Sequence, residues 1–332
     1  MEENDDEKLY VGFDIHESTF YGTIMDKQGE VIADGNVKYS KDAIQSFIGF
    51  IPSTKIKIAI EACGLSRGVQ KLLEELGYDV VQANPLKTNR IAGDKKTDKV
   101  DSKTLADLLR TGYLPLVYVP SDEINKIRDI ARHRTRLVRM RAGNKVRIKS
   151  CLHRDGKKFP GGWTKETMAR LKEMNPMIKD YVDLIEMLDV LIKQSEKEIR
   201  AIARSNYNMV LLQSIPGIGE ISAFLIYGEI GDIRRFDNPK SLVNYAGLCP
   251  GIFQTGKTCY DVTNKANNKW LKWILTECAG RAAMVDDRYF KYFTKVNKRK
   301  GWKVARRSVA RKMMTDIWYI LTNEEPYRKS ES

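Results

Sequence analysis

Two aspartates stand three residues apart in the stretch GDKKTDKVDSKTLADLLR, residues 93 to 110. This stretch predicts the start of a helix, and the i and i+3 positions of Asp98 and Asp101 share one helix face. Their carboxylates are therefore within reach of a common ion, and Lys95 and Lys96 precede them. Acids beside lysines are expected where a site holds a cation together with a phosphate.

Two further acids lie in predicted strands. Asp14 is the polar residue of the apolar run YVGFDI, at the centre of the first strand, where an unpaired charge is costly to bury. Glu61 closes the run KIKIAIEA at the C-terminal end of another strand. Four converging acids repel one another unless divalent cations neutralise them. Carboxylates suit Mg²⁺ or Mn²⁺, and a pair of such ions can activate a hydroxyl and stabilise the leaving oxygen of a phosphodiester.

A simpler interpretation is open for each acid taken singly. A strand aspartate is commonly a turn or cap residue, and either Thr97 or Asp98 could cap a surface helix through TDKVD. The combination of a strand Asp, a strand-end Glu and a helical DxxD in this order is more specific, and it favours catalytic chemistry.

The elements that position these acids follow from the hydrophobic period. Residues 9 to 37 predict two strands in a hairpin around the turn DKQGE, and they allow a third strand after it. KDAIQSFIGFI predicts a helix, KIKIAIEA a strand, GLSRGVQKLLEELGY a helix and DVVQAN a short strand, after which helices follow. This order predicts a mixed sheet flanked by helices over residues 8 to about 120. No GxGxxG or GxxxxGK[ST] loop follows a strand, which weakens the alternative of a doubly wound nucleotide-binding domain.

Composition favours a polyanionic partner. The 332 residues carry 57 Lys+Arg against 43 Asp+Glu, a formal net charge of +14, so nucleic acid is the first candidate and an anionic membrane the second. No apolar run is long enough to span a membrane and the first residues are acidic, so a cytoplasmic protein is expected. The five scattered cysteines include no CxxC pair, which is typical of reduced thiols.

The middle of the chain predicts a basic helix and a coiled coil. Residues 124 to 158 hold 13 Lys/Arg against two acids, which favours a nucleic-acid surface over a solvated charged face. The candidate contacts are Arg132, Arg134, Arg136, Arg139, Arg141, Lys145, Arg147 and Lys149. Residues 175 to 204 then keep a heptad spacing at Ile178, Tyr181, Ile185, Leu188, Ile192, Ser195, Ile199 and Ile202. This coiled coil could pair within the chain, against the basic helix, or between chains.

The C-terminal part predicts helices and a tight turn. SIPGIGEISA resembles a helix-hairpin-helix turn, in which Gly217 and Gly219 relieve the bend and expose N–H groups to a phosphate, although a plain helix-turn-helix would look similar. Trp270, Trp273 and Trp302 interleave with basic residues, and we expect them in the core more than as base-stacking platforms.

These motifs together resemble one family. The order of D, E and DxxD, KTDKVDSKTLADLL, the IPGIG hairpin and the block YAGLCPGIFQTGKT…KANNKWLKWILTECA are similar to the DEDD transposases, the RuvC-like recombinases of the insertion-sequence group numbered one hundred and ten. The resemblance implies an α/β plus α protein: a RuvC-like ribonuclease-H fold domain at 8–120 holding the four acids, a basic helix and coiled coil at 121–207, and a mostly helical transposase domain at 208–325. It also implies DNA as substrate, an element-encoded bridge RNA that chooses target and donor, and a dimer or a tetramer made of two dimers.

The sequence departs from the family pattern at the nucleophile. The family supplies a serine before glycine, whereas this chain reads QTG, with Thr255 in that position. Lys257 and Lys265 beside it are candidate nucleic-acid contacts, the block is one residue short before Lys257, and Asn267 stands where glycine is common. Threonine offers the same hydroxyl, but its methyl group restricts χ1 and crowds an in-line attack. Either Thr255 replaces the serine or this copy has lost part of the reaction.

Three functions are consistent with the sequence. The first is a transposase that uses the four acids and Thr255. The second is a metal-dependent endonuclease of the Holliday-junction type that hydrolyses with water. The third is a nucleic-acid-binding derivative without chemistry.

Overall fold

The computed structural model describes residues 8–49, 55–91, 97–249, 251–255, 258–262 and 267–328. The chain divides into two compact units, Met1–Val119 and Pro120–Ser332, each with hydrophobic cores of its own.

The first unit is built on a five-stranded mixed sheet in the order β3-β2-β1-β4-β5. Its strands are β1 Leu9–Ile15, β2 Thr19–Met25, β3 Val31–Lys38, β4 Ile56–Glu61 and β5 Asp79–Ala83. β1, β2 and β3 pair antiparallel in sequence, while β1 pairs parallel with β4 and β4 with β5. The predicted mixed sheet is confirmed, and its order is compatible with a ribonuclease-H-like fold.

The strand count before the predicted turn differs from our expectation. DKQGE does join two antiparallel strands, β2 and β3, but the segment before it forms two strands instead of one. The N–H of His16 donates to the carbonyl of Thr19 at 2.9 Å, which closes a tight turn and folds β2 back on β1. No further strand follows the hairpin before the next helix, because β3 leads into α1 (Lys41–Ile48) after two residues.

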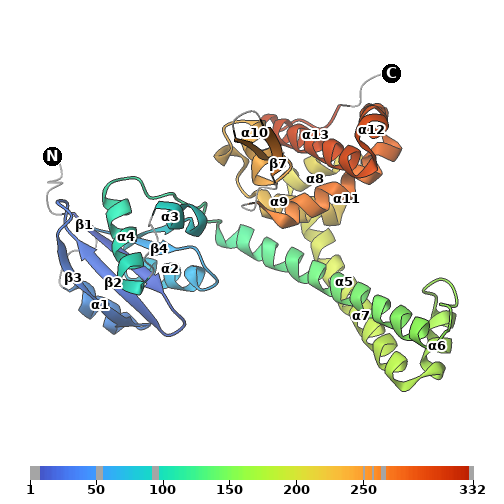
Figure 1. Cartoon of the computed structure of the whole chain (residues 1–332), viewed down its shortest axis with the longest axis horizontal. Coiled ribbons are helices and arrows are strands. Elements are labelled where there is room, and N and C mark those ends of the chain that lie inside the picture. The colour runs from blue at the N-terminus through green and yellow to red at the C-terminus, as the bar shows by residue number, and fades with distance from the viewer. Residues whose placement is uncertain are drawn as a thin grey trace. The chain divides into compact units, whose positions relative to one another are not determined.

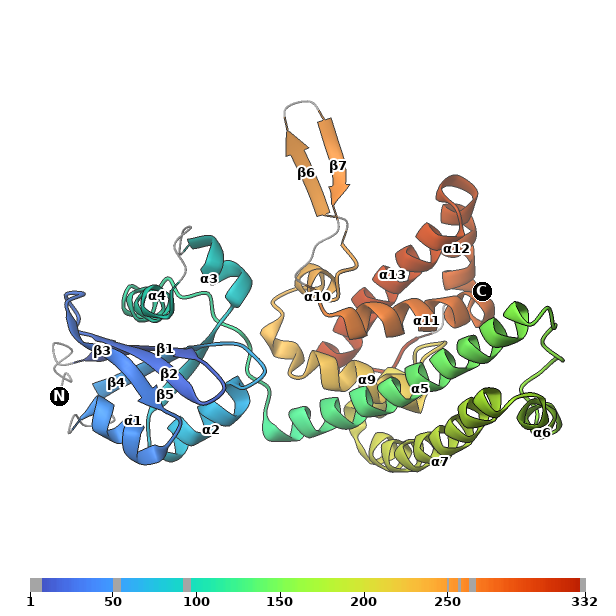
Figure 2. The same cartoon turned by 60° about the horizontal axis from the view of Figure 1, so that its bottom comes forward.

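Helices cover both faces of this sheet. On one face, Val11 and Phe13 of β1 pack in a core with residues of α1 and of α2 (Ser66–Glu75). On the other face lies α4 (Asp98–Arg110), whose Leu105 packs against the sheet. Figure 2 shows α4 on one side of the sheet and α1 and α2 on the other. The short α3 (Pro85–Ile91) follows β5.

Gly12 allows α4 to approach the sheet closely. A Cβ atom added at Gly12 would lie 2.1 Å from the carbonyl oxygen of Ser102 and 2.7 Å from the backbone nitrogen of Ala106. Both atoms belong to the main chain of α4, so no side chain can move aside. The helix that bears Asp98 and Asp101 therefore depends on glycine at this position.

We expect Gly12→Ala to destabilise the first unit by about 1–3 kcal/mol or more, because α4 must move away from β1. Gly35 in β3 is the matched control, since an added Cβ there meets nothing within 4 Å. Gly35→Ala should be close to neutral. Denaturant unfolding of both variants measures the difference, and equal effects would show that α4 is not seated on Gly12.

The second unit contains a long antiparallel helix pair. α5 (Asp122–Arg154) and α7 (Pro176–Ser205) lie side by side, with α6 (Lys165–Met174) between them in sequence (Figure 1). Leu137 of α5 packs with Leu188 and Ile192 of α7. The predicted coiled coil therefore pairs within the chain, against the basic helix.

The heptad register of α7 needs a correction at two positions. Its buried apolar residues are Ile178, Val182, Ile185, Leu188, Ile192, Ile199 and Ala203. Val182 and Ala203 thus take the places predicted for Tyr181 and Ile202, which are only partly buried. A straight helix drifts from a strict heptad repeat, so the residue next to each predicted position faces α5 instead.

The helices that follow pack around one large core, and β6 and β7 pair with each other as a two-stranded antiparallel sheet. They are α8 Tyr207–Gln213, α9 Glu220–Ile230, a 3-10 turn Ile233–Arg235, α10 Pro239–Tyr245, β6 Gly251–Thr255, β7 Thr258–Val262, α11 Lys269–Val285, α12 Asp287–Lys300 and α13 Trp302–Asn323. Trp270 and Trp273 are partly buried against this core as expected, whereas Trp302 is 55% exposed.

The turn between α8 and α9 contains both glycines of SIPGIGEISA. Gly217 has φ +87°, and an added Cβ would lie 2.7 Å from main-chain atoms of Cys278 and Ala282 on α11. Gly217 therefore serves close packing on α11. The N–H of Gly219, at the N-cap of α9, donates to the Ser222 hydroxyl at 2.9 Å.

Candidate active site

The first turn of α4 is fixed over the sheet by local and distant contacts. Thr97 is the N-cap, and its hydroxyl accepts the N–H of Val100, so Asp98 is not needed for capping. The buried hydroxyls of Ser102 and Thr23 lie 2.7 Å apart and join α4 to β2. The carboxylates of Asp98 and Asp101 are therefore held on the face of the sheet that α4 covers.

Asp14 and Glu61 come to the same edge of the sheet. Asp14 is the penultimate residue of β1, not its centre, and Glu61 is the last residue of β4. The parallel pairing of these strands ends at Phe13 and Ile60, so Asp14 and Glu61 are the next residues on neighbouring strand ends. Side chains alternate along strands, which places both acids on the α4 face, opposite to Phe13 and Ile60.

His16 joins two of the acids, and the sequence did not reveal it. Its Nε2 lies 3.4 Å from Oδ2 of Asp14 and 3.1 Å from Oδ2 of Asp98. One ligand atom from each of these three residues lies within 4.8 Å of the other two, so the group could hold a metal ion. The spacing DxH at a strand end was the available signal, but it needs the turn after β1 to bring the imidazole back.

The electrostatics of Asp14 fit a cation site. Burial raises the pKa of its carboxyl above the ordinary value, His16 opposes this shift, and the charges of Asp101 and Asp98 add to it. Asp101 is thereby close enough for its charge to act on Asp14. An acid whose charge is disfavoured by burial and by like charges gains most when a divalent cation arrives.

Two transposase family models match this chain. A model of the transposases of the IS110 group matches residues 11–154, and a second, described as the IS116/IS110/IS902 transposase family, matches residues 209–295. The chain belongs to the IS110/IS116/IS902 family of transposases. Among the part of the transposase that the structure describes, no helix is long and apolar enough to cross a membrane.

Three similar proteins match the transposase over different shares of its length. Protein y4qE of Sinorhizobium fredii, named as a transposase, is 28% identical over 84% of this chain and 70% of its own length. The transposase for insertion sequence element IS1111A of Coxiella burnetii is 24% identical over 96% of this chain and 91% of its own. The pilin gene-inverting protein of Moraxella lacunata is 29% identical over 46% of this chain and 48% of its own.

We expect Asp14→Asn to stabilise the transposase in EDTA at pH 7 by ~0.5–2 kcal/mol, as relief of a strained site commonly does. Because the pKa of Asp14 is raised in the folded state, its charged form opposes folding. This loss of folding stability begins as the pH rises above the unfolded pKa of about 3.9, and it is complete once the pH exceeds the raised pKa of the folded state. The gain should therefore shrink towards pH 4. Thermal melts across pH measure it.

Added Mg²⁺ should reverse this order, because a ligand that binds only the folded state stabilises it. The wild type should melt at higher temperature with Mg²⁺ and Asp14→Asn should not respond. Asp79→Asn is the matched control: its carboxylate is exposed and lies 3.7 Å from Lys57, so its loss should be nearly neutral. A variant at Asp14 that still responds to Mg²⁺ would argue against this residue as a ligand.

Lysine contacts near the acids are partly internal to the transposase. Lys99, next to Asp98, makes a 2.5 Å ion pair with Asp34 of β3, which also accepts the hydroxyl of Tyr21 at 3.0 Å. This pair raises the pKa of Lys99 and lowers that of Asp34. Lys99 therefore anchors the first turn of α4 to the edge of the sheet. The predicted phosphate contacts Lys95 and Lys96 lie outside the described residues.

Thr255 belongs to the second unit of the transposase. It is the last residue of β6 and pairs with Thr258 at the start of the antiparallel strand β7. Its main chain is thus at the end of a two-stranded hairpin. Lys257 and Lys265 lie outside the described residues.

Most arginines predicted to bind nucleic acid have partners inside the transposase. Arg134 pairs with Glu196 and Arg141 with Asp189, both across the α5–α7 seam. Arg139 lies over the rings of Trp270 and Trp273, at 4.6 and 5.5 Å from their centroids. Lys145 and Lys149 lie over aromatic rings, and Arg147 donates to Asn144. Arg136 is exposed with no such partner among the described residues.

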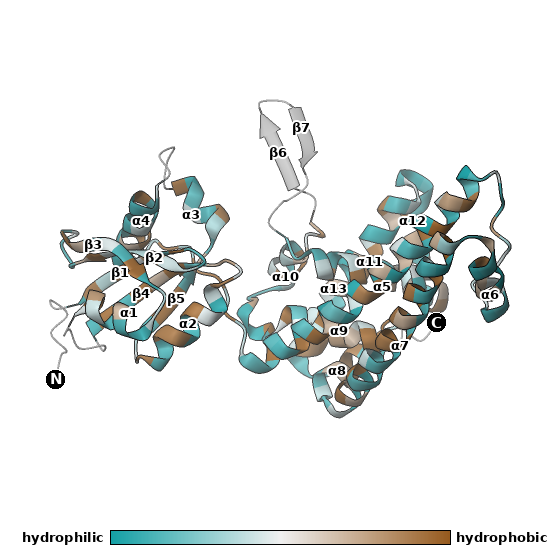
Figure 3. Cartoon of the chain, turned by 90° about the horizontal axis from the view of Figure 1, so that it is seen from below, coloured by the Kyte–Doolittle hydropathy of each residue, from teal (hydrophilic) through white to brown (hydrophobic). Residues whose placement is uncertain are grey.

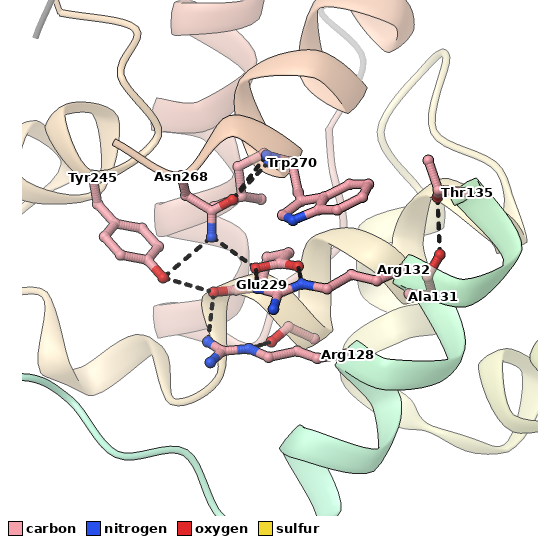
Figure 4. A network of polar contacts seen from close by, with 10 residues as sticks. Arg128, Ala131, Arg132, Thr135, Glu229, Tyr245, Asn268 and Trp270 are labelled. Carbon is pink, nitrogen blue, oxygen red and sulfur yellow. Dashed lines mark hydrogen bonds and ion pairs between the residues drawn. The ribbon is translucent and has the colours of Figure 1, made fainter. Parts of the chain in front are cut away.

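Arg132 belongs to a polar network around a buried acid (Figure 4). Glu229 is 0% exposed and accepts two hydrogen bonds from Arg132, at 2.7 and 2.8 Å, and one from Asn268 at 2.7 Å. Asn268 also caps α11 by accepting the N–H groups of Trp270 and Leu271. Arg132 thereby links α5 to the start of α11, and its removal leaves a buried unpaired charge at a cost of about 3–5 kcal/mol.

Proposed function

We propose that this transposase cuts and rejoins the DNA of an insertion element at the acidic cluster of its first unit. The observation that carries the proposal is the convergence of Asp14, Asp98 and Asp101 on one face of the sheet, with Glu61 on the neighbouring strand end. Asp14 lies on β1 and the two aspartates on α4, far apart in sequence, and the charges of Asp98 and Asp101 disfavour ionisation of Asp14.

The donor set fits a hard divalent cation, which we propose to be Mg²⁺ or Mn²⁺. Asp14, Glu61, Asp98 and Asp101 would hold it through carboxylate oxygens, and His16 would lie beside it. When bound, the cation supplies Lewis-acid stabilisation of charge on the reacting phosphate. The acids would position the cation, and the close packing of α4 on Gly12 would keep the α4 aspartates beside the strand-end acids.

Thr255 is the proposed nucleophile. Its hydroxyl oxygen would form a bond to phosphorus while the bond to a deoxyribose oxygen breaks, leaving a phosphothreonyl ester and a free DNA hydroxyl that takes up a proton. Reversal of this step with a different DNA end rejoins the strands without loss of bond energy.

The family resemblance extends the proposal to partners. We propose that a structured guide RNA selects the DNA sites, and that the enzyme acts as a dimer or tetramer because recombining two duplexes needs paired cleavages. Most of the α5 cations predicted to bind nucleic acid have partners within the chain. The nucleic-acid contacts that we propose on this helix are therefore Arg136 and the exposed cations near it.

A suicide DNA substrate tests this function. A nicked element end that loses a short fragment after cleavage should trap a covalent protein–DNA adduct in Mg²⁺ and none in EDTA. Clean hydrolysis without an adduct would instead identify a structure-selective nuclease. Salt-sensitive binding without any cleavage would identify a derivative that has lost the chemistry.

A further inference from the structure

The segment from residue 288 to 315 has an unusual charge balance. It contains eleven Lys/Arg and no Asp or Glu. It forms most of α12 and the first part of α13, which pack against each other. Figure 3 colours much of α12 as hydrophilic.

Two rows of cations run along these helices. Lys291, Lys295 and Lys298 are spaced i, i+4 and i+7 on α12, so they share one side of that helix. Lys303, Arg307 and Arg311 are spaced i, i+4 and i+8 on α13. All six are exposed, and no ion pair joins any of them to an acid within the described part of the chain.

The state of these cations differs from that of the α5 arginines. Arg132, Arg134 and Arg141 have acidic partners within the chain, so their charge is already neutralised. The six cations of α12 and α13 face solvent with their charge uncompensated, which is the condition under which phosphates displace counterions with a gain in free energy.

We propose that the two cation rows of α12 and α13 form a nucleic-acid-binding surface that contacts backbone phosphates without reading sequence. The surface deepens the proposed function, since it rests on DNA or RNA being the partner. An anionic membrane fits less well, because Tyr289 of α12 is fully buried in the core and Tyr292 and Phe293 pack against it, which leaves Phe290 as the exposed large apolar side chain of this helix.

The test is binding of the full chain in EDTA to two labelled DNA duplexes of unrelated sequence, over a range of salt. The variant Lys291→Glu/Lys295→Glu/Lys298→Glu should lose on the order of tenfold or more in affinity for both duplexes, and the slope of log K against log salt should fall by about 1 for each lost contact. The control Lys179→Glu/Lys193→Glu/Lys197→Glu, at exposed positions of α7, changes the net charge equally and should have a much smaller effect.

Folding is checked by thermal melts, and the corresponding triple Gln variant should show a smaller loss in the same direction. Equal affinity and slope in the α12 variant and the α7 control would overturn the proposal, as would loss of binding to phosphatidylserine vesicles with DNA binding unchanged. Because EDTA prevents cleavage, the result is independent of the chemistry. Two results separate failure of the surface from failure of the proposed function. An Asp101→Asn protein that binds normally but does not cleave shows that binding does not depend on the chemistry. A wild type that binds through α12 but never cleaves keeps the surface and overturns the proposed function.

Discussion

Asp101→Asn should lower the rate of DNA cleavage in Mg²⁺ by about 10³-fold or more, because loss of cation stabilisation at the phosphate removes several kcal/mol. The same loss is expected for Asp14→Asn and Glu61→Gln, since the proposed cation site includes all three acids. Nucleic-acid binding should persist and could tighten, because the change removes negative charge from a basic protein. Cleavage of the suicide substrate under single-turnover conditions gives the rate.

Asp107→Asn is the matched control on the same helix. Asp107 lies on α4 as Asp101 does, but its carboxylate pairs with Arg110 at 2.6 Å, and it is not among the charges that act on Asp14. It should retain nearly full cleavage. If Asp101→Asn cleaved as fast as Asp107→Asn, the acidic cluster would not be the site of chemistry.

The four acids could be proposed from the sequence because each one breaks a local pattern. Asp14 interrupts an apolar strand, Glu61 ends one, and Asp98 with Asp101 opens a helix. Strand and helix periods depend on neighbours in the chain, so the mixed sheet and α4 followed from them. The split of the first strand did not, since it depends on one hydrogen bond from His16 to Thr19.

The acidic partners of Lys99 and of the α5 arginines could not be read from the sequence. Lys99 finds Asp34 on another strand, and Arg132 finds Glu229, which is 97 residues away. A basic helix with few acids of its own therefore looked like a free cationic surface. Its neutralising acids lie on α7 and α9, and only folding brings them together.

The close packing of α4 on the sheet could not be predicted from the sequence for the same reason. Glycine at position 12 reads as a weak point in a strand, since it packs no side chain. The structure gives it a specific use, because the main chain of α4 occupies the space of its missing Cβ. The placement of Asp98 and Asp101 therefore depends on the lack of a Cβ atom at Gly12.

Thr255→Ser should retain or raise the rate of covalent adduct formation, while Thr255→Val and Thr255→Ala should abolish the adduct. Serine keeps the hydroxyl and removes the methyl group that restricts χ1, whereas valine keeps the shape and loses the oxygen. Valine is therefore the sharpest of the three variants, since packing is nearly conserved and only chemistry is removed.

Thr258, the strand partner of Thr255 in β7, offers the matched control. Thr258→Val makes the same substitution at the paired position of the neighbouring strand and should leave formation of the adduct unchanged. The alternative for Thr255 is a hydrogen bond of about 1 kcal/mol that only caps its loop. In that case Thr255→Val and Thr255→Ala fold slightly less well, Thr255→Ser keeps the bond, and all three variants react alike. A Thr255→Val protein that still forms the adduct would exclude this hydroxyl as the nucleophile, and adduct-free cleavage by every variant, wild type included, would assign hydrolysis by water at the acidic cluster.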